Sequence, residues 1–390
     1  MGSGASYLNT EHMIGLKSVY EAKLAEGLSD EALLVAMQEH VAQLGGASTD
    51  STYTPSEVKR VLIIGAAGAI GKCLTERLLQ NGVEVIAALR KTPLPESLNS
   101  MGGLIQEFGV NCTDEASIRK CFEKHSGIDC CWNLAAPLSV ETASNPDLAY
   151  DTVVNGMDRL LKVMRDFNVP RICFSDSIGS YGGDAPRESN AAWLVANPTQ
   201  DPGSDYGVQK RKCRELMRDF VAEAPDSRNC RWAVIPGVLH GDASWGAGTT
   251  EYALDALKCA AEKTTFVCPI EEDVLLPMIW RDDLIDGLYS LTMANAATLT
   301  EPDGGYAMAG LSFTALELFA EIKKRVDTFE FSTEKDTEKL MNESPAALFA
   351  RLWVDRLTPA EASRDLSFTS TNTDIGVIID RILEVWNSRS

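Results

Sequence analysis

The chain has 390 residues, which at about 150 residues per domain is enough for two domains or one large one with a sizeable buried core. Apolar residues make up 45% and charged residues 24%, which excludes a mainly disordered or fibrous protein. The formal net charge of −20 disfavours nucleic acid and anionic membrane surfaces as partners, because both are themselves negatively charged.

Residues 1–57 are expected to form an N-terminal helical arm followed by a linker. Apolar residues recur at three- and four-residue intervals in 10–26 and 30–44, which predicts two amphipathic helices. From Gly45 to Glu57 the composition shifts to Gly, Ser, Thr and Pro, which is typical of a linker. The sequence leaves three roles for the arm open: packing against the protein surface, closing over a site, or joining subunits.

Residues 58–237 alternate between short apolar runs and amphipathic segments. Strands are predicted at 58–65, 83–90, 105–110, 129–136, 171–177 and 231–237, and helices at 72–80, 113–124, 146–167 and 205–220. This alternation predicts an α/β fold with a doubly wound (Rossmann) parallel sheet, which binds ligands at the carboxyl ends of its strands. Residues 238–390 have mixed periodicity and are expected to form a smaller, mainly substrate-binding region that partly returns to the Rossmann domain.

The cysteine and histidine patterns indicate neither a disulfide framework nor a metal site. None of the ten cysteines forms a C-x-x-C pair, and Cys130 and Cys131 fall in a predicted strand, which favours buried reduced thiols. The four histidines are far apart in sequence. The longest apolar stretch, 61–71, is about half of the ~20 residues that cross a bilayer, and the N-terminal MGSGAS lacks the charge of a signal peptide. A cytoplasmic location is therefore expected.

A glycine-rich turn, GAAGAIG from Gly65 to Gly71, follows the first predicted strand and opens a helix. Glycines at such a turn let the backbone N–H groups and the positive helix end approach a pyrophosphate. The order strand, glycine turn, helix therefore predicts a dinucleotide site.

The second predicted strand ends in Leu89-Arg90-Lys91, without the acid that an NAD site usually offers to the adenosine ribose. Glu84, the nearest carboxylate, lies too early in the strand. An arginine at this position accommodates a 2′-phosphate, so NADP is the expected cofactor and NAD the alternative. In the other interpretation Arg90 and Lys91 are solvated loop charges.

Ser177, Tyr206 and Lys210 form the second candidate constellation. Tyr206 and Lys210 are four residues apart at the start of a predicted helix, so their side chains share one face. A nearby ammonium favours the phenolate, and a phenol with a lowered pKa acts as a general acid or base near neutral pH. A serine hydroxyl at the end of a neighbouring strand can hold the substrate oxygen.

From Val58 onward the chain resembles an extended short-chain dehydrogenase/reductase, a member of the NAD-dependent epimerase/dehydratase family. The motifs that carry this resemblance are the glycine turn, Asn133-Leu134-Ala135-Ala136, Ser177-Ile178-Gly179-Ser180-Tyr181-Gly182 and the Tyr206/Lys210 pair. The distal half most resembles the L-threonine 3-dehydrogenase group, through Gly246-Ala247-Gly248-Thr249-Thr250-Glu251-Tyr252-Ala253 and Leu276-Pro277-Met278-Ile279-Trp280.

The resemblance implies a substrate alcohol or carbonyl between Ser177, Tyr206 and a nicotinamide ring, with Lys210 also reaching the nicotinamide ribose. The implied cofactor contacts are Gly65, Gly68, Ala69, Ile70, Gly71, Arg90, Lys91, Asn111, Cys112, Leu134, Ala135, Ala136, Tyr206, Lys210 and Pro236. The implied substrate contacts are Ser139, Ser177, Ile178, Tyr206, Gly237, Thr249, Thr250 and Trp280. A homodimer is also implied by the family.

One departure from the threonine dehydrogenases concerns the substrate carboxylate. Their strand arginine before the Pro-Gly step aligns with Val234, and burying a carboxylate without a cation is costly. Arg281 and His240 are candidate replacements, although an ion pair with Asp282 or Asp283 and a solvent-exposed loop histidine are the alternatives.

The sequence thus predicts an NADP(H)-dependent oxidoreductase that transfers a hydride to or from a small polar hydroxy or keto compound. An epimerase or dehydratase that transiently reduces its nicotinamide is the alternative enzyme. A nucleotide-binding regulatory protein is a third interpretation, disfavoured by the complete Ser/Tyr/Lys set.

Overall fold

The structure is a computed structural model that describes residues 58–301 and 304–388, all within one compact unit. The predicted N-terminal arm lies outside the described residues. The predicted boundary between residues 237 and 238 stays a prediction.

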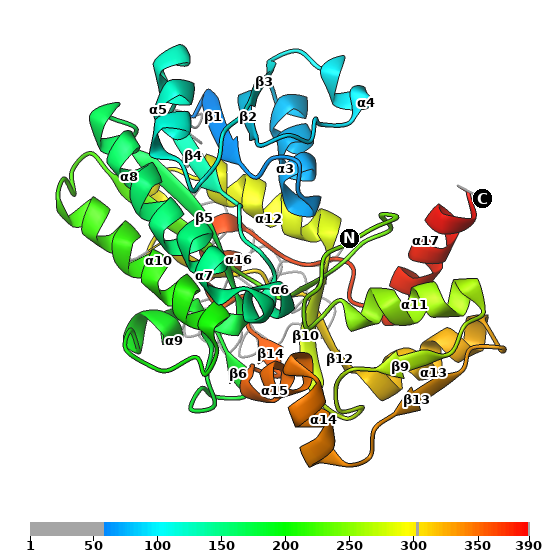
Figure 1. Ribbon diagram of the computed structural model, residues 1–390. Coiled ribbons are helices and arrows are strands. Elements are labelled where there is room, and N and C mark those ends of the chain that lie inside the picture. Colours follow the sequence, from blue (N-terminus) through cyan, green and yellow to red (C-terminus); the bar gives the residue numbers. More distant parts are fainter. Residues whose placement is uncertain (1–57, 302–303, 389–390) are drawn as a thin grey trace, which may run out of the picture. The chain divides into compact units, whose positions relative to one another are not determined.

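A seven-stranded, fully parallel sheet forms the centre of this unit (Figure 1). Its strand order is β11-β7-β5-β4-β1-β2-β3. The strands are β1 (Arg60–Ile64), β2 (Glu84–Leu89), β3 (Leu104–Phe108), β4 (Cys130–Asn133), β5 (Arg171–Ser177), β7 (Asn229–Ile235) and β11 (Gly305–Ala307). The predicted Rossmann-type sheet is confirmed.

Helices cover both faces of the sheet (Figure 1). On one face lie α5 (Glu115–Lys124), α8 (Gly156–Asp166) and α10 (Asp205–Ala222), and on the other α3 (Ala69–Gln80) and α12 (Arg281–Met293). The apolar run of β1 serves both layers, because successive side chains of a strand point to opposite faces. Leu62 and Ile64 belong to the first hydrophobic core, and Val61 and Ile63 to the second.

The long helix predicted at 146–167 is interrupted. It consists of α7 (Pro146–Tyr150), a π-helical segment at Asp151–Asn155, and α8. Arg159 donates to the Asp151 carboxylate at 2.7 Å and to the backbone oxygens of Asp151 and Cys112 at 3.1 Å. These hydrogen bonds accompany the π-helical segment, whose turns are wider than those of an α-helix. The apolar periodicity of the sequence does not indicate them, so it predicts one continuous helix.

The C-terminal region contributes β11 to the central sheet and otherwise forms small sheets. One small sheet has three strands in the order β12 (Leu311–Thr314), β10 (Leu275–Trp280) and β8 (Gly237–Leu239). Two further sheets have two strands each: β13 (Phe331–Thr333) pairs with β9 (Phe266–Cys268), and β14 (Arg356–Leu357) pairs with β6 (Glu188–Ser189). The accompanying helices include α11 (Tyr252–Glu262), α13 (Ala315–Arg325), α14 (Thr337–Glu343), α15 (Pro345–Leu352), α16 (Ala360–Leu366) and α17 (Ile375–Asn387). The remaining short helices are α4 (Glu96–Asn99), α6 (Ser139–Ser144) and α9 (Ala191–Ala196). Because β8 follows β7 after a single residue, Pro236, this region begins at the carboxyl edge of the central sheet.

Candidate functional site

A cleft of about 720 Å³ lies at the carboxyl ends of β1, β2, β3 and β4. Predicted cofactor contacts that line it are Gly65, Gly68, Arg90, Lys91, Asn111, Cys112, Ala135 and Ala136. A second cavity of about 140 Å³ adjoins it at Ala136 and Pro137. Ile70, Leu134, Tyr206, Lys210 and Pro236 line this smaller pocket, so most of the predicted cofactor contacts follow one continuous path.

The glycine turn brings three backbone segments into contact. Gly65 has a φ of +86°, which favours glycine, and a Cβ there would lie 2.9 Å from the Ala135 nitrogen. A Cβ on Gly71 would collide with the Gly65 carbonyl oxygen. Gly68 then begins α3 without any side-chain cap. No side-chain oxygen caps this helix end, so its backbone N–H groups are available to an anion such as a pyrophosphate, and the predicted contact stays a prediction.

Arg90 and Lys91 are exposed residues of the larger cleft, and neither makes an ion pair with the described residues. Glu84 is paired with Arg60 and does not line the cleft. The cleft therefore has, at the end of β2, two cations without an ion-pair partner among the described residues. Asn111, beside them, uses its side-chain oxygen to accept from the Thr113 N–H at 3.2 Å.

The smaller pocket is lined by Ser177, at the end of β5, and by Tyr206 and Lys210, which are neighbours on α10. Lys210 is buried, and its Nζ donates to the Ser175 carbonyl oxygen at 2.7 Å and lies 5.3 Å from the Tyr206 ring centre. Ser177 ends β5, and its Oγ accepts from the Gly179 N–H at 3.1 Å. All three residues line the same pocket, and the ammonium lies beside the phenol ring.

Local structure explains why Tyr206 lines this pocket. Ser204 caps α10 by accepting from the Gly207 N–H at 3.2 Å, so Tyr206 falls in the first helical turn. A Cβ on Gly179 would lie 2.7 Å from a Tyr206 ring carbon, so only a glycine lets the ring lie this close to the turn after β5.

A buried ion pair lies directly behind Ser177. Asp176 is paired with Arg214, one helical turn beyond Lys210 on α10. The Asp176 carboxylate also accepts from the Ser177 N–H at 2.8 Å and from the Ser180 hydroxyl at 2.5 Å. Arg214 donates to the Ser180 Oγ at 2.9 Å. This network fixes the turn that carries Ser177 to the helix that carries Tyr206 and Lys210.

The start of α6 and the segment before α11 also line the smaller pocket. Ser139 Oγ accepts from the Thr249 N–H at 3.1 Å, and the two hydroxyl oxygens are 3.1 Å apart. Thr250 Oγ1 donates to the Glu251 carboxylate at 3.2 Å. Glu251 also lines the pocket, and burial raises its pKa to about 7. Glu251 was not among the predicted site residues, although it lies in the Gly246–Ala253 segment that resembles the threonine dehydrogenases.

Some of the other predicted residues line the smaller pocket and some do not. Trp280 does not line the smaller pocket, and its indole donates to Asp282 at 3.2 Å. Gly237, Ile178 and Thr249 do line it. Ala69 and Gly71 lie in the first turn of α3 and line neither cavity. The roles predicted for all of these residues stay predictions.

The structure does not bring a replacement cation to the position of the missing arginine. Val234 is buried in the hydrophobic core. Arg281 and Lys72 both pair with Asp242, at 2.7 and 2.6 Å, and His240 accepts from the Asp242 N–H at 3.1 Å. None of these residues lines the smaller pocket. Lys210 is therefore the one cation among its lining residues in the described part of the chain.

Glu251→Gln tests the burial of this carboxyl. The unfolded carboxyl ionises near pH 4.5 and the folded one only near pH 7, so ionisation favours the unfolded chain as the pH rises between these values. We expect the free energy of unfolding of the native protein, relative to the variant, to be larger at about pH 5 than at about pH 8. Urea unfolding of both proteins at each pH measures this difference in the free energy of unfolding. The same difference at both pH values would mean that the carboxyl is solvated.

Among the described residues, no group of three or more His, Cys, Asp and Glu side chains is arranged to hold a metal ion. All ten cysteines lie in the described residues and none of them forms a disulfide there; the sulfurs of Cys130 and Cys173 are 3.5 Å apart. No described helix has the length and apolar character that crossing a membrane requires.

Residues 61–233 match the model of the NAD dependent epimerase/dehydratase family. This matched segment is a segment of that family, and the match supports an enzyme of the extended short-chain dehydrogenase/reductase type that works with a nicotinamide cofactor.

Within the family, the chain is similar to threonine dehydrogenases. It is 27% identical over 297 residues to the mitochondrial L-threonine 3-dehydrogenase of Bos taurus, covering 73% of this chain and 74% of the relative. It superimposes on the GalE-like L-threonine dehydrogenase of Cupriavidus necator (holo form) with a TM-score of 0.70 and 26% identity, covering 83% and 99% of the two chains. The Thermus thermophilus UDP-glucose 4-epimerase, solved in complex with NAD, shares the fold at a TM-score of 0.65 and 18% identity, over 83% of this chain and 99% of that one.

Proposed function

We propose that the protein is an NADP(H)-dependent oxidoreductase that interconverts a small polar alcohol and its carbonyl compound. The observation that carries this proposal is the single pocket that holds Ser177, Tyr206 and Lys210 and adjoins the glycine-lined cleft.

The chain's own groups supply proton transfer and orientation. A bound nicotinamide supplies the hydride acceptor or donor. Tyr206 takes the proton of the substrate hydroxyl during oxidation and returns it during reduction. The buried Lys210 ammonium, near the ring, stabilises the phenolate. Ser177 donates a hydrogen bond to the substrate oxygen, which orients the reacting carbon.

Arg90 supports the choice of NADP over NAD. It is exposed, lines the cleft and has no ion-pair partner among the described residues, whereas no acid from the end of β2 lines the cleft. We expect Arg90→Ala to raise the Kd for NADP⁺ about 10- to 100-fold, because a charge-assisted bond to the 2′-phosphate is lost.

Fluorescence titration with NADPH and NADH measures this effect. Lys120→Ala, which removes an exposed cation of α5 outside the cleft, is the matched control and should leave both affinities unchanged. Equal affinity for both cofactors in the native protein, or no change in Arg90→Ala, would contradict the NADP assignment.

The charges of the smaller pocket support a substrate without a carboxylate. Its lining includes Glu251, and Lys210, the one cation among its lining residues in the described ranges, is needed beside the phenol. An anionic substrate would be buried beside a carboxyl group without a compensating cation. We therefore infer a neutral or amine-bearing hydroxy or keto compound.

An assay at about 340 nm, where reduced nicotinamide absorbs, tests the function with NADP⁺ and NAD⁺ in parallel. Neutral hydroxy compounds, amino alcohols, hydroxy acids and sugars form the panel. Oxidation of neutral or amino compounds with NADP⁺ is expected. Preferential oxidation of hydroxy acids would overturn the substrate class.

Glu251 favours one alternative, an epimerase or dehydratase. A dehydratase needs, in addition to the tyrosine, a group that removes the proton from the carbon next to the transient carbonyl, and Glu251 is a second titratable group of the same pocket with a pKa of about 7. Either enzyme would change the stereochemistry or unsaturation of its substrate with no net change in nicotinamide absorbance. Product analysis beside the absorbance assay distinguishes the two reactions.

A further inference from the structure

Trp353, which directly follows α15, carries a buried polar group without a partner. The residue is 3% exposed and lines the smaller pocket, yet its indole Nε1 has no hydrogen-bond partner among the described residues. Four other tryptophans donate from Nε1 to a protein oxygen, namely Trp132, Trp245, Trp280 and Trp386. A buried N–H group without an acceptor is unfavourable, so it requires an explanation.

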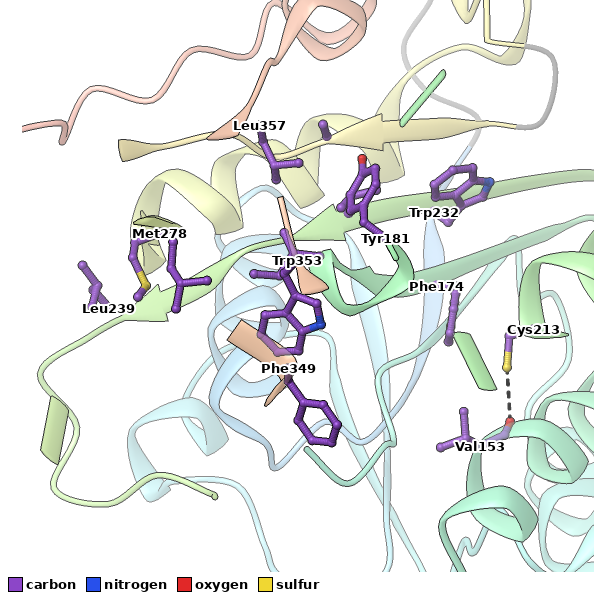
Figure 2. Packing of buried hydrophobic residues seen from close by; sticks show 14 of the residues in the cluster. Val153, Phe174, Tyr181, Cys213, Trp232, Leu239, Met278, Phe349, Trp353 and Leu357 are labelled. Atoms are coloured by element: carbon purple, nitrogen blue, oxygen red, sulfur yellow. Dashed lines mark hydrogen bonds between the residues drawn. The ribbon is translucent and has the colours of Figure 1, made fainter. Parts of the chain in front are cut away.

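The Trp353 ring is fixed close to the proposed reaction centre. It stacks on Phe349 of α15, with the ring centres 6.3 Å apart and the planes 10° from parallel (Figure 2). A Cβ on Gly179 would lie 2.7 Å from Cδ1 of Tyr206 and 3.4 Å from Cζ2 of Trp353. Cζ2 is bonded to the carbon that carries Nε1. The part of the indole next to its nitrogen and the ring of Tyr206 therefore both lie close to Gly179.

The position of the unpartnered N–H group defines what it can bind. Because Ser177, Tyr206 and Trp353 line one pocket, a substrate whose oxygen lies between the serine and the phenol occupies the same pocket as the indole. An indole nitrogen donates one hydrogen bond and accepts none, so its ligand must be an acceptor oxygen.

We propose that Trp353 forms a substrate subsite, in which its indole N–H donates to an uncharged carbonyl oxygen close to the reacting carbon, as in an amide or ester. A neutral donor cannot compensate the burial of a carboxylate, and Glu251 on the same pocket disfavours an anion further. This inference rests on the proposed function and assigns to the C-terminal region a direct part in substrate selection.

L-Threoninamide and L-threonine are suitable probes, because they share the hydroxyl and amino groups and differ at the carbonyl carbon. With saturating NADP⁺, the native protein should oxidise or bind the amide better than the acid. Trp353→Phe should lower kcat/KM for the amide about 3- to 10-fold, as expected for one lost neutral hydrogen bond, and leave the affinity for NADPH unchanged. Trp193→Phe, which removes an indole N–H outside both cavities, is the matched control and should change neither quantity.

The indole N–H resonances of the ¹⁵N-labelled native protein give a readout that needs neither turnover nor a variant that folds well. The Trp353 signal, assigned as the one missing in Trp353→Phe or by its contacts with Phe349, should move downfield when L-threoninamide is added to the NADP⁺ complex. An unmoved signal in a complex shown by other resonances to be saturated, or an unchanged kcat/KM in Trp353→Phe, would overturn the subsite. If NADPH binds but no alcohol or carbonyl compound of the wider panel reacts, the proposed function fails instead.

Discussion

Tyr206→Phe is expected to lower the rate of hydride transfer by about 10²- to 10⁴-fold, the contribution typical of a positioned general acid or base. The variant keeps the ring that packs against Gly179 and loses the hydroxyl that transfers the proton. The cofactor cleft stays lined by the same backbone, so the affinity for NADPH should change little. Single-turnover absorbance measurements with saturating substrate and cofactor determine the rate.

Tyr150→Phe is the matched control for this variant. Tyr150 is a partly exposed tyrosine whose hydroxyl accepts from Lys212 at 3.0 Å, outside both cavities. Its loss should leave turnover unchanged. If Tyr206→Phe behaves like Tyr150→Phe, another group transfers the proton.

Arg214→Met is expected to destabilise the protein by about 3–5 kcal/mol, because it leaves the Asp176 carboxylate buried without its cation. The two side chains are among the few buried charged groups of the described chain, with Asp176 2% and Arg214 8% exposed. Since Asp176 also accepts from Ser177 and Ser180, the variant should lower kcat as well. Urea unfolding and steady-state kinetics measure the two effects.

The double variant Asp176→Asn with Arg214→Met separates charge from packing. It removes both charges together, so it should recover much of the stability lost in Arg214→Met alone. Arg165→Met breaks an exposed ion pair with Glu223 and should have a much smaller effect. A loss in Arg214→Met as small as that in Arg165→Met would show that the buried pair does not hold the turn and the helix together.

The fold of the nucleotide-binding half could be predicted because its signals are local. The apolar runs that form β1, β2, β4 and β5 are long enough to be recognised as strands in the sequence, and each is bounded by glycine or polar residues. The four-residue spacing of Tyr206 and Lys210 places both on one helix face whatever surrounds the helix. The strand end that carries Ser177 follows from the same periodicity.

The remaining features depend on contacts between segments far apart in sequence. Strand β11 has three residues, too few for a periodic pattern, and is recognised only by its pairing with β7. Arg281 pairs with Asp242 rather than with its neighbours Asp282 and Asp283, because the chain brings the 242 loop to the start of α12. Trp353 enters the pocket from a segment more than a hundred residues beyond Tyr206, so no spacing rule could associate the two.

The most direct test of the account is a crystal structure of the full chain with NADP⁺ bound. We expect the pyrophosphate at the Gly65–Gly68 turn, the 2′-phosphate at Arg90, and the nicotinamide in the smaller pocket with its ribose in contact with Tyr206 and Lys210. A nicotinamide bound away from Tyr206, or a dinucleotide that does not enter the glycine-lined cleft, would contradict the proposed redox chemistry.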